Sequence, residues 1–252
     1  LEVEKKLGLD GKDQIEKYGV EPFIEQCKES VWKYKGMWED FSHTVGFWAD
    51  MKNPYVTYHN DYIESEWWAL KEIWKKGLLY EGHKIVPYCP RCGTPLSSHE
   101  VAQGYKDVKE RSAVVRFKVK GEDAYILAWT TTPWTLPSNV ALCVNPDEDY
   151  VKVTSKGYTY YMAAALVDTV LGEGAEVLEH YQGKDLEFKE YEPLFPYAEK
   201  RIGNKKAYYV VCDTYVTLTD GTGVVHIAPA FGEDDSKVGH RYDLPFVQLV
   251  NE

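Results

Sequence analysis

The chain has 252 residues, a formal net charge of −11 at neutral pH, and 44% hydrophobic and 27% charged residues. This length is enough to bury a sizeable core, and no apolar run approaches the ~20 residues that a membrane-spanning helix needs. The acidic balance argues against broad, nonspecific binding of nucleic acid, which depends on neutralisation of phosphates by Lys and Arg. It leaves open the capture of one end of a nucleic acid.

The first residues, Leu1-Glu-Val-Glu-Lys-Lys6, are charged and favour a helix rather than a signal peptide. We therefore expect a cytoplasmic protein with no membrane association. The chain starts without Met, inside an amphipathic pattern, and stops just after the apolar run Phe246-Val-Gln-Leu-Val250. Both ends indicate a segment cut from a longer protein.

Residues 1 to about 80 have helical periodicity. Ile24, Cys27, Val31, Tyr34 and Trp38 recur at spacings of three and four, which places one apolar stripe on a helix. Because aromatic side chains carry the largest burial energies, we expect such stripes to pack in a core or an interface rather than to bind a cofactor.

A second helix is expected from about Ile63 to Leu79. Trp67 and Trp74 share its apolar face, and Gly77 marks its end. The same packing role is expected for these Trp side chains.

The segment Tyr88-Cys-Pro-Arg-Cys-Gly-Thr-Pro-Leu96 contains a Cys-x-x-Cys-Gly knuckle. Such a turn points two thiolates at one ion and forms half of a structural zinc site, which needs four ligands. The half-site is Cys89 and Cys92, and His83 and His99 are near enough in sequence to add ligands. The redox alternative for Cys-x-x-Cys needs a thioredoxin-like βαβ context, which is not evident. The other cysteines are single and scattered: Cys27, Cys143 and Cys212.

From about Ser112 the pattern becomes that of β-strands, with apolar residues alternating with charged ones. Strands are predicted at 112–119, 124–129, 139–144, 150–154, 158–162, 185–189, 207–217 and 222–228, with short helices at 162–171 and 233–241. Many short strands with few helices are typical of a closed or nearly closed barrel. The fold class predicted is mixed α/β: a helical lead-in with the zinc-ribbon half-site over residues 1–107, then a β-barrel domain over 108–252.

A run of threonines stands at the end of one predicted strand, in Trp129-Thr-Thr-Thr-Pro-Trp-Thr-Leu-Pro137. Threonine has a high β-propensity, so the run has a plain structural explanation. The following Pro133, however, ends the ladder and directs the preceding residues into a loop, where hydroxyl groups can bind a ligand.

A second segment, Gly221-Thr-Gly-Val-Val-His-Ile-Ala-Pro-Ala-Phe-Gly-Glu-Asp-Asp235, carries His226 on a strand and three acids at a helix start. Acids at that position are favoured by the helix dipole, so capping is one explanation. The functional alternative is a carboxylate that binds a cationic amine. A lone histidine on a strand is more often a core residue with a satisfied hydrogen bond than a catalyst.

Together these segments resemble the isoleucyl-tRNA synthetase family. The two segments just described resemble its editing-domain signatures, and Cys89 to Asp107 resembles the lead-in to that domain, as do Gly46-Phe-Trp-Ala-Asp50 and Trp67-Trp-Ala-Leu-Lys71. The similarity covers nearly the whole chain. Valyl and leucyl relatives typically carry Thr-Thr-Arg-Pro where this chain has Thr-Thr-Thr-Pro, which favours the isoleucyl branch.

The resemblance implies hydrolytic removal of valine from mischarged tRNA(Ile), and possible hydrolysis of valyl-adenylate. Asp235 then anchors the α-ammonium group, the threonines place the ester and a water, and His226 helps define the size of the pocket. Trp134 and Phe231 are expected as walls. The implied catalytic residues are Thr130, Thr131, Thr132, His226 and Asp235, and the substrate-binding residues are Trp129, Trp134, Phe231 and Asp235.

The family's two ATP signatures, of His-Ile-Gly-His and Lys-Met-Ser-Lys-Ser type, do not occur in the sequence. ATP and Mg²⁺ are therefore expected only in the parent enzyme, and no cofactor is expected for editing. The family's second cysteine pair for zinc lies after residue 252, so zinc is expected to be bound incompletely here. The implied partners are the 3′ end of tRNA(Ile) carrying valine and the rest of the synthetase. The alternatives are a non-catalytic zinc-ribbon and barrel module that binds RNA or a partner, and the editing domain of a valyl or leucyl relative.

Overall fold

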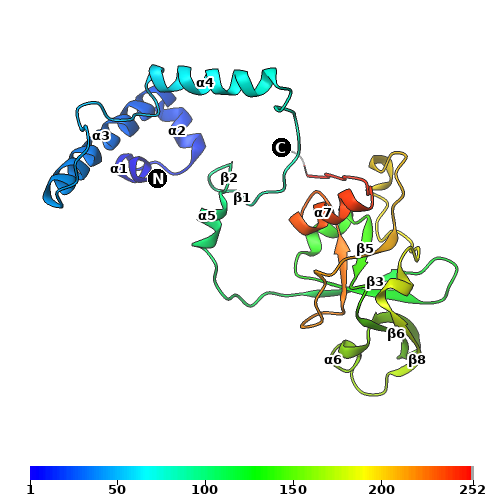
Figure 1. The fold of residues 1–252 in the computed structure, drawn as a ribbon. Helices are drawn as coiled ribbons and strands as arrows, with labels where there is room; N and C mark the ends of the chain where they lie inside the picture. The colour runs from blue at the N-terminus through cyan, green and yellow to red at the C-terminus, as the bar shows by residue number, and fades with distance from the viewer. Residues whose placement is uncertain (251–252) are drawn as a thin grey trace. The chain divides into compact units, whose positions relative to one another are not determined.

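A computed structural model describes residues 1–250, in which the chain forms two compact units that divide between Gln103 and Gly104 (Figure 1). Within this described part, no helix is both long and apolar enough to cross a membrane. The first unit is mainly helical and the second is built on one curled sheet.

The first unit begins with four helices, whereas the periodicity predicts a helical region and describes two helices in it. The predicted second long helix begins at Asn60 and ends at Lys75. A two-stranded hairpin and a short helix follow, and in that helix Ser97 and Glu100 form a reciprocal capping box. The elements are α1 (Glu2–Leu7), α2 (Lys12–Tyr18), α3 (Val20–Thr44), α4 (Asn60–Lys75), β1 (Tyr88–Cys89), β2 (Thr94–Pro95) and α5 (Ser98–Ala102).

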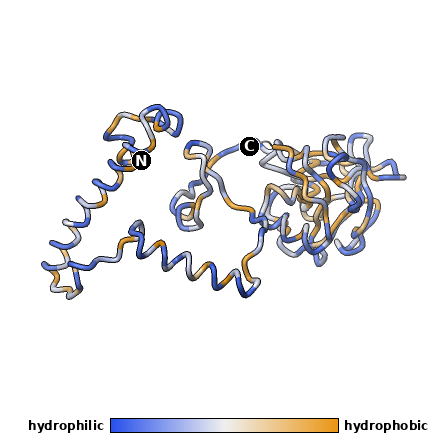
Figure 2. Tube along the Cα trace, turned by 90° about the horizontal axis from the view of Figure 1, so that it is seen from above, coloured by the Kyte–Doolittle hydropathy of each residue, from blue (hydrophilic) through white to orange (hydrophobic). Residues whose placement is uncertain are grey.

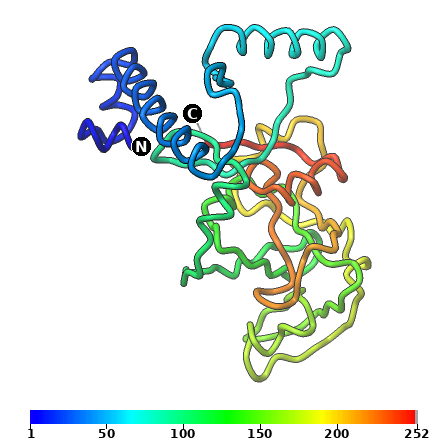
Figure 3. The backbone as a smooth tube through the Cα atoms, turned by 60° about the vertical axis from the view of Figure 1, so that its left-hand side comes forward, coloured from blue at the N-terminus to red at the C-terminus, as the bar shows by residue number. Residues whose placement is uncertain are grey.

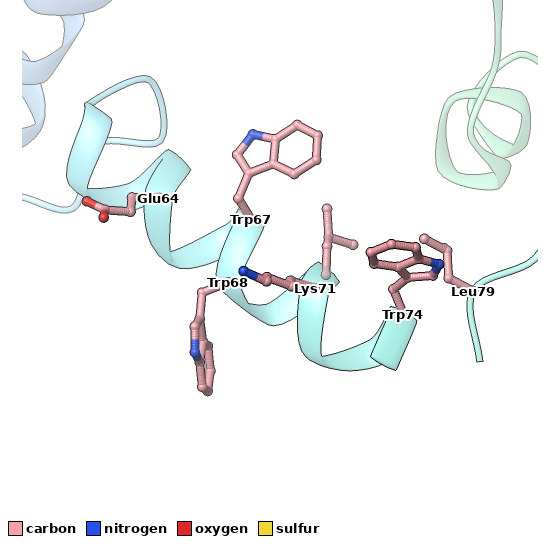
Figure 4. A pocket seen from close by; sticks show the side chains of 7 residues that line it. Glu64, Trp67, Trp68, Lys71, Trp74 and Leu79 are labelled. Atoms are coloured by element: carbon pink, nitrogen blue, oxygen red, sulfur yellow. The ribbon is translucent and has the colours of Figure 1, made fainter. Parts of the chain in front are cut away.

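The apolar faces of α3 and α4 are not buried within the first unit, so their stripes form no core there, and the expected alternative of interface packing stays a prediction. Trp38 is 68% exposed and Trp74 is 66% exposed, and neither helix contains a buried residue. Figure 4 shows Trp67 and Trp74 projecting from α4 and Leu79 just after the helix, and all three side chains are exposed. Apolar residues at helical spacing identify an apolar face of a helix. They do not show whether residues of the same unit pack against that face.

The second unit contains an eight-stranded sheet with the order β8-β6-β7-β4-β10-β5-β9, and β3 pairs with β4 outside this path. β4 runs parallel to both β7 and β10, and β5 runs parallel to β9, while the other pairs are antiparallel. The strands are β3 (Ala113–Lys118), β4 (Tyr125–Thr130), β5 (Ala141–Val144), β6 (Asp149–Ser155), β7 (Tyr158–Ala163), β8 (Glu176–Gln182), β9 (Tyr209–Cys212) and β10 (Val224–Ile227).

The sheet is curled but not closed, because β8 and β9 end the strand order without pairing with each other. The mixed α/β class is confirmed, in the form of a half-barrel rather than a closed barrel. Figure 3 shows the yellow-green backbone around β6, α6 (Val167–Leu171) and β8 as a lobe at one end of the unit.

The centre of the sheet is buried on both faces. Along β5, Leu142 and Val144 join one apolar cluster, whereas Ala141 and Cys143 join another. The second cluster includes Val238 of α7 (Glu233–Arg241), which is fully buried. Alternate residues of a strand point to opposite faces, so two packed faces explain why β5 is a continuous apolar run. Figure 2 shows hydrophobic residues gathered in the interior of this unit.

Three local predictions differ from the structure, whereas α7 occupies the residues predicted for it. The strand predicted at 185–189 overlaps a short 3₁₀-helix, η3 (Gly183–Leu186). The preceding strand β8 has no counterpart among the predictions, since five of its seven residues are exposed and the apolar alternation is absent. The strand predicted at 207–217 is limited to β9, the four residues from Tyr209 to Cys212.

Candidate active site

The parallel pairing of β4 and β10 brings the threonine run and the acidic helix start together. Trp129 of β4 lies opposite Val225 of β10 in the register. Because parallel strands end at the same edge of a sheet, the chain leaves β4 through Thr131 close to where it leaves β10 through Ala228. The two segments identified in the sequence, about 95 residues apart in the numbering, therefore meet at one edge.

A hollow of about 250 Å³ lies between these segments. Such a volume is below the ~300–1,000 Å³ of sites for drug-sized ligands, and it suits a small group. The structure thus brings together every site residue predicted in this unit except Trp134. The hollow is lined by Trp129, Thr130, Thr131, Thr132, Thr135, Val225, His226, Phe231, Gly232 and Asp235.

Asp235 lies in the first turn of α7 and is held toward the strand rather than used as a cap. Its Oδ2 atom accepts a hydrogen bond from the backbone N–H of Ala228 at 2.9 Å. The N-cap residue of α7 is Gly232, which makes no side-chain cap. Burial raises the pKa of Asp235 to about 6, with a smaller contribution from the charge of Asp234. Asp235 is half-buried at the edge of a hollow. A cationic ligand there would offset the free-energy cost of its partly desolvated negative charge.

Gly232 leaves the space that the Asp235 carboxyl group occupies. A Cβ atom at Gly232 would lie 3.0 Å from the Asp235 Cγ atom and 3.2 Å from both carboxylate oxygens. We expect Gly232→Ala to displace this carboxylate while the sheet stays folded, because the nearest contacts are to one side chain. Hydrolysis by the site should fall by about tenfold, the worth of one good hydrogen bond. A crystal structure of the variant with an unmoved carboxylate, or unchanged hydrolysis, would contradict this.

The threonine hydroxyls form a short network at the end of β4. The backbone N–H of Thr132 donates to Thr130 Oγ1 at 3.0 Å, and the Thr135 hydroxyl donates to the Thr132 carbonyl at 2.9 Å. Within residues 1–250 the hydroxyl of Thr131 makes no hydrogen bond and its residue is exposed. Thr131 therefore has its full hydrogen-bonding capacity available for a ligand.

His226 lies on β10 and is 6% exposed. Its Nε2 atom lies 2.9 Å from Thr135 Oγ1. Burial lowers the pKa of His226 to about 4, so the ring is neutral at physiological pH. His226 is thus a buried histidine with a polar partner that also lines the hollow.

Trp134 does not line the hollow, and its side chain is 70% exposed. It belongs to the 3₁₀-helix η1 (Pro133–Ser138), in which side chains three residues apart lie over one another. Thr132 and Thr135 are therefore on the same side, facing the hollow, and Trp134 is turned away from them. Thr135 also lines the hollow but was not among the predicted site residues, and its spacing of three from Thr132 was the available signal.

The Cys-x-x-Cys pair lies in the turn between β1 and β2, where the backbone N–H of Cys92 lies 3.4 Å from the Cys89 sulfur. This hydrogen bond is the main cause of a lowered pKa for the Cys89 thiol, which favours the thiolate that binds zinc. Among the described residues no three His, Cys, Asp or Glu side chains gather as a metal site. In this part of the chain His83 and His99 do not gather with the two thiols, and the ring of His99 contacts Gln103 at 2.8 Å. The two thiols fit half of a tetrahedral site.

The described cysteines of the second unit are not suited to act as nucleophiles. Cys143 and Cys212 are buried, and burial raises the pKa of both thiols, that of Cys212 to about 11. Neither lines the hollow, and no Ser or Lys does so. A cysteine thiolate or lysine amine is therefore not part of this site.

The model of the family "tRNA synthetases class I (I, L, M and V)" matches residues 1–220. The chain is 63% identical over its whole length to an isoleucine–tRNA ligase of Clostridium acetobutylicum and 61% identical to that of Clostridium novyi. In both cases it spans 24% of the relative's length. The editing domain of the P. knowlesi cytosolic leucyl-tRNA synthetase is similar with a TM-score of 0.42 and 14% identity, over 56% of this chain and 66% of that one. The chain belongs to the class I tRNA synthetase family and is homologous to a region of isoleucine–tRNA ligases.

Proposed function

We propose that the 104–252 unit is an editing site, which hydrolyses the ester of valine wrongly attached to tRNA(Ile) within an isoleucine–tRNA ligase. The observation that carries this proposal is the shared hollow: Thr131 and Asp235, from segments far apart in the sequence, line the same cavity of about 250 Å³. Buried and exposed threonine hydroxyls line it together with a half-buried carboxylate. That combination suits a small ester with a positive nitrogen.

The need for such a site follows from the chemistry of the two amino acids. Valine is one methylene smaller than isoleucine. A methylene contributes only about 1–3 kcal/mol of binding free energy in an apolar pocket, and the selection of isoleucine over valine is the standard example of this limit. A pocket for isoleucine therefore admits valine. A second pocket that excludes isoleucine by size and hydrolyses the smaller ester supplies the missing selectivity.

In the proposed complex Asp235 binds the α-ammonium group. Its Oδ2 atom is already fixed by Ala228, which leaves the other carboxylate oxygen for the ligand. A bound cation lowers the free-energy cost of the negative charge on Asp235. The carboxylate therefore favours the protonated form of the substrate's amine, and the amine favours the ionised carboxylate. Phe231 and Trp129 form apolar parts of the same wall.

Thr130, Thr131 and Thr132 place the ester carbonyl and the attacking water in this proposal. The water oxygen bonds to the carbonyl carbon, the bond from that carbon to the ribose oxygen breaks, and the proton released by the water goes to the ribose oxygen. Aminoacyl esters are already activated, so orientation and hydrogen bonding to the developing oxyanion supply most of the needed rate.

Direct attack by water is favoured over an acyl-enzyme. The nearest candidate for a nucleophile and base is Thr135 with His226, but the Thr135 proton is donated to the Thr132 carbonyl. In residues 1–250 the Nδ1 atom of His226 has no hydrogen-bond partner, so the ring lacks the third group that orients a catalytic triad.

The experiment that tests the proposal uses the full-length synthetase containing this chain. Valyl-tRNA(Ile) and isoleucyl-tRNA(Ile) are each incubated with the enzyme in the absence of ATP, and release of the amino acid is measured. We expect rapid hydrolysis of the valyl ester and slow hydrolysis of the isoleucyl ester, and both to depend on Asp235. Equal rates for the two esters would contradict editing at this site.

We place the protein in the cytoplasm, with the 3′ end of tRNA(Ile) and the rest of the synthetase as its partners. ATP and Mg²⁺ would serve the parent enzyme's activation step, for which this chain carries no signature sequence. Valyl-adenylate is a second proposed substrate, because it presents the same amine and side chain to the hollow.

We propose Cys89 and Cys92 as two ligands of a structural zinc ion whose other ligands come from elsewhere in the synthetase. Zinc would fix the turn between β1 and β2. We expect the 252-residue chain, purified without chelators, to contain clearly less than one zinc per chain, since two thiolates make only half of the usual four-ligand site. Elemental analysis checks this, with Cys89→Ala as the control that removes the remaining metal. Stoichiometric, chelator-resistant zinc would contradict the half-site.

A further inference from the structure

Three tyrosine rings lie together on one face of the sheet, where β4 and β7 begin. Tyr125 lies opposite Tyr160 in the parallel register of these strands, and Tyr158 is two residues before Tyr160. The three pairs of ring centroids are 6.1, 6.4 and 6.3 Å apart. Residues two apart in a strand point to the same face of the sheet. The three rings therefore form one cluster, which we call the tyrosine platform.

Two cations of the neighbouring strand β3 lie over this platform. The Arg116 guanidinium carbon is 4.8 Å from the Tyr158 ring centroid and 5.4 Å from that of Tyr125. The Nζ atom of Lys118 is 4.8 Å from the Tyr125 centroid. Phe117, between the two cations, is buried on the opposite face. The distances are within the range of about 6 Å for cation–π contacts, so the rings hold both cations at this face.

Arg116 supplies the positive charge that is not neutralised on this face. Lys118 is paired with Asp123, whereas within residues 1–250 Arg116 forms no ion pair. Arg116 is exposed and Tyr158 is 47% exposed, while Tyr160 is buried and supports them from below. In a chain with a net charge of −11, an exposed arginine without a carboxylate partner favours contact with an external anion.

The combination of rings and arginine indicates which class of anion is bound. Surfaces that bind single-stranded nucleic acid combine positive charge with aromatic side chains on which bases stack, and arginine adds cation–π contacts. Bases also stack on the plane of an arginine guanidinium group. An acidic protein segment would pair with the charge but would leave the rings without a flat partner. The observations therefore favour single-stranded RNA.

The platform lies on the same face of β4 as part of the hollow. Trp129 lines the hollow and follows Tyr125 by four residues along the strand, a separation of about 13 Å at about 3.3 Å per residue. Stacked nucleotides of one strand advance about 3.4 Å each, so about four of them cover this distance. A single strand whose last residue is in the hollow is thus long enough to reach the platform with the nucleotides before it.

We propose that the tyrosine platform and Arg116 bind the single-stranded nucleotides that precede the terminal adenosine of the tRNA. Tyr158 and Arg116 provide the stacking surface, and the charge of Arg116 attracts the phosphates between the bases. Tyr125 and Tyr160 hold these two side chains in place. The platform then recognises the RNA tail and not the amino acid. The identity of the substrate rests on the proposed editing function, whereas binding of RNA to this face does not.

The contribution of the platform is measured by ester hydrolysis with the full-length synthetase. The substrates are the valyl esters of adenosine and of the trinucleotide CpCpA. We expect the wild type to have a higher kcat/KM for the trinucleotide ester. Arg116→Ala and Tyr158→Ala should each lower the ratio of kcat/KM for the trinucleotide over the adenosine ester by about tenfold, the effect of one base–aromatic stacking contact. The change should lie in KM, because the platform is outside the hollow.

Two further variants separate stacking from general effects of substitution. Tyr158→Phe keeps the ring and should keep the wild-type ratio. The matched control is Lys184→Ala, which removes an exposed cation of η3 away from this face and should also keep the ratio. Urea unfolding checks that Arg116→Ala is folded. Two results would overturn the proposal: equal kcat/KM for the two esters in the wild type, or a wild-type ratio in both Arg116→Ala and Tyr158→Ala.

Binding is also measured without any reaction, by nuclear magnetic resonance of the ¹⁵N-labelled chain. We expect CpCpA without an attached amino acid to shift the amide signals around Arg116, Tyr125 and Tyr158, and to do so less in Arg116→Ala. A polyglutamate peptide should not shift them. No shift with CpCpA, or equal shifts with the peptide, contradicts an RNA site. Shifts with CpCpA in a wild type that hydrolyses neither ester contradict the proposed function and leave the platform standing.

Discussion

Replacing Asp235 by Asn is expected to stabilise the second unit near pH 7.5 and to remove most of the hydrolysis of valyl-tRNA(Ile). Burial raises the pKa of this carboxyl group from the usual 3.8 to about 6. The folded state therefore binds more protons than the unfolded state between these two values. It loses stability as the pH rises through that window, and above pH 6 it bears the full cost of the buried charge.

The size of this cost follows from the shift in pKa. Each pKa unit corresponds to about 1.4 kcal/mol, so the cost at neutral pH is on the order of 2–3 kcal/mol. Asparagine carries no charge, and its Oδ1 atom can still accept the hydrogen bond from Ala228. Without the charge, the ammonium group of the substrate loses its partner, and kcat/KM should fall by about 100-fold or more, as for truncation of a buried ion pair.

The pH dependence of stability provides a further check on the same variant. The pKa of His226 is shifted in the opposite sense, from 6.5 down to about 4, so its contribution to stability is lost as the pH falls through this range. In the wild type the two residues largely offset each other. In Asp235→Asn we expect the His226 contribution alone, a free energy of unfolding that rises between pH 4 and pH 6.5.

The measurement is urea unfolding followed by hydrogen exchange at the amides of β5 and β10, which report on the second unit alone. Asp234→Asn is the matched control, because it removes the same charge from the same turn of α7 but at an exposed residue outside the hollow. Asp234→Asn should change the free energy of unfolding by no more than about 0.5 kcal/mol. It should leave the rate of valyl-tRNA(Ile) hydrolysis unchanged. An Asp235→Asn variant that is less stable than the wild type at pH 7.5, or hydrolyses at the parental rate, contradicts the assignment.

Gly223→Ala is expected to be the most damaging small substitution near the site. Gly223 has φ +72°, and a Cβ atom there would lie 2.4 Å from the Ala163 Cβ atom and 2.9 Å from the Leu218 Cδ2 atom. The carbonyl of Gly223 also accepts a 2.6 Å hydrogen bond from the buried Tyr150 hydroxyl. The turn cannot move without loss of this bond, and β10, which carries His226, begins at the next residue.

The expected loss combines two physical costs. Left-handed backbone strain is worth about 1–2 kcal/mol, and overpacking of a core adds about 1–3 kcal/mol. Gly121→Ala separates them, because Gly121 has a similar φ of +74° but no atom within 4 Å of the added Cβ. We expect Gly223→Ala to lose at least about 1 kcal/mol more than Gly121→Ala in urea unfolding. Equal losses would show that the predicted clash does not exist.

The sequence was sufficient for the parts of the site that are continuous along the chain. Pro133 follows closely on the end of β4 at Thr130, and α7 begins at Glu233 after Gly232, so both local signals mark element boundaries correctly. The meeting of these segments depends on the parallel pairing of β4 with β10. That pairing is non-local and no local pattern contains it; the resemblance to a known family implied only that residues of both segments serve one site.

Other features depend on contacts that a pattern of residues does not contain. The inward direction of Thr135 and outward direction of Trp134 follow from the 3₁₀ geometry of η1, which its sequence does not distinguish from a loop. β8 is an exposed strand that forms by pairing with β6, and its own residues lack a strand-like alternation. The stripes of α3 and α4 were read correctly as apolar faces, but periodicity does not say which segment covers such a face.

The most direct test of the whole account is a crystal structure of the chain with a non-hydrolysable valyl-adenosine analogue. The α-ammonium nitrogen should lie within hydrogen-bonding distance of an Asp235 carboxylate oxygen, with the carbonyl of the analogue beside Thr130 to Thr132 and its isopropyl group against His226. An analogue bound outside this hollow, or bound there with its nitrogen turned away from Asp235, would contradict the account.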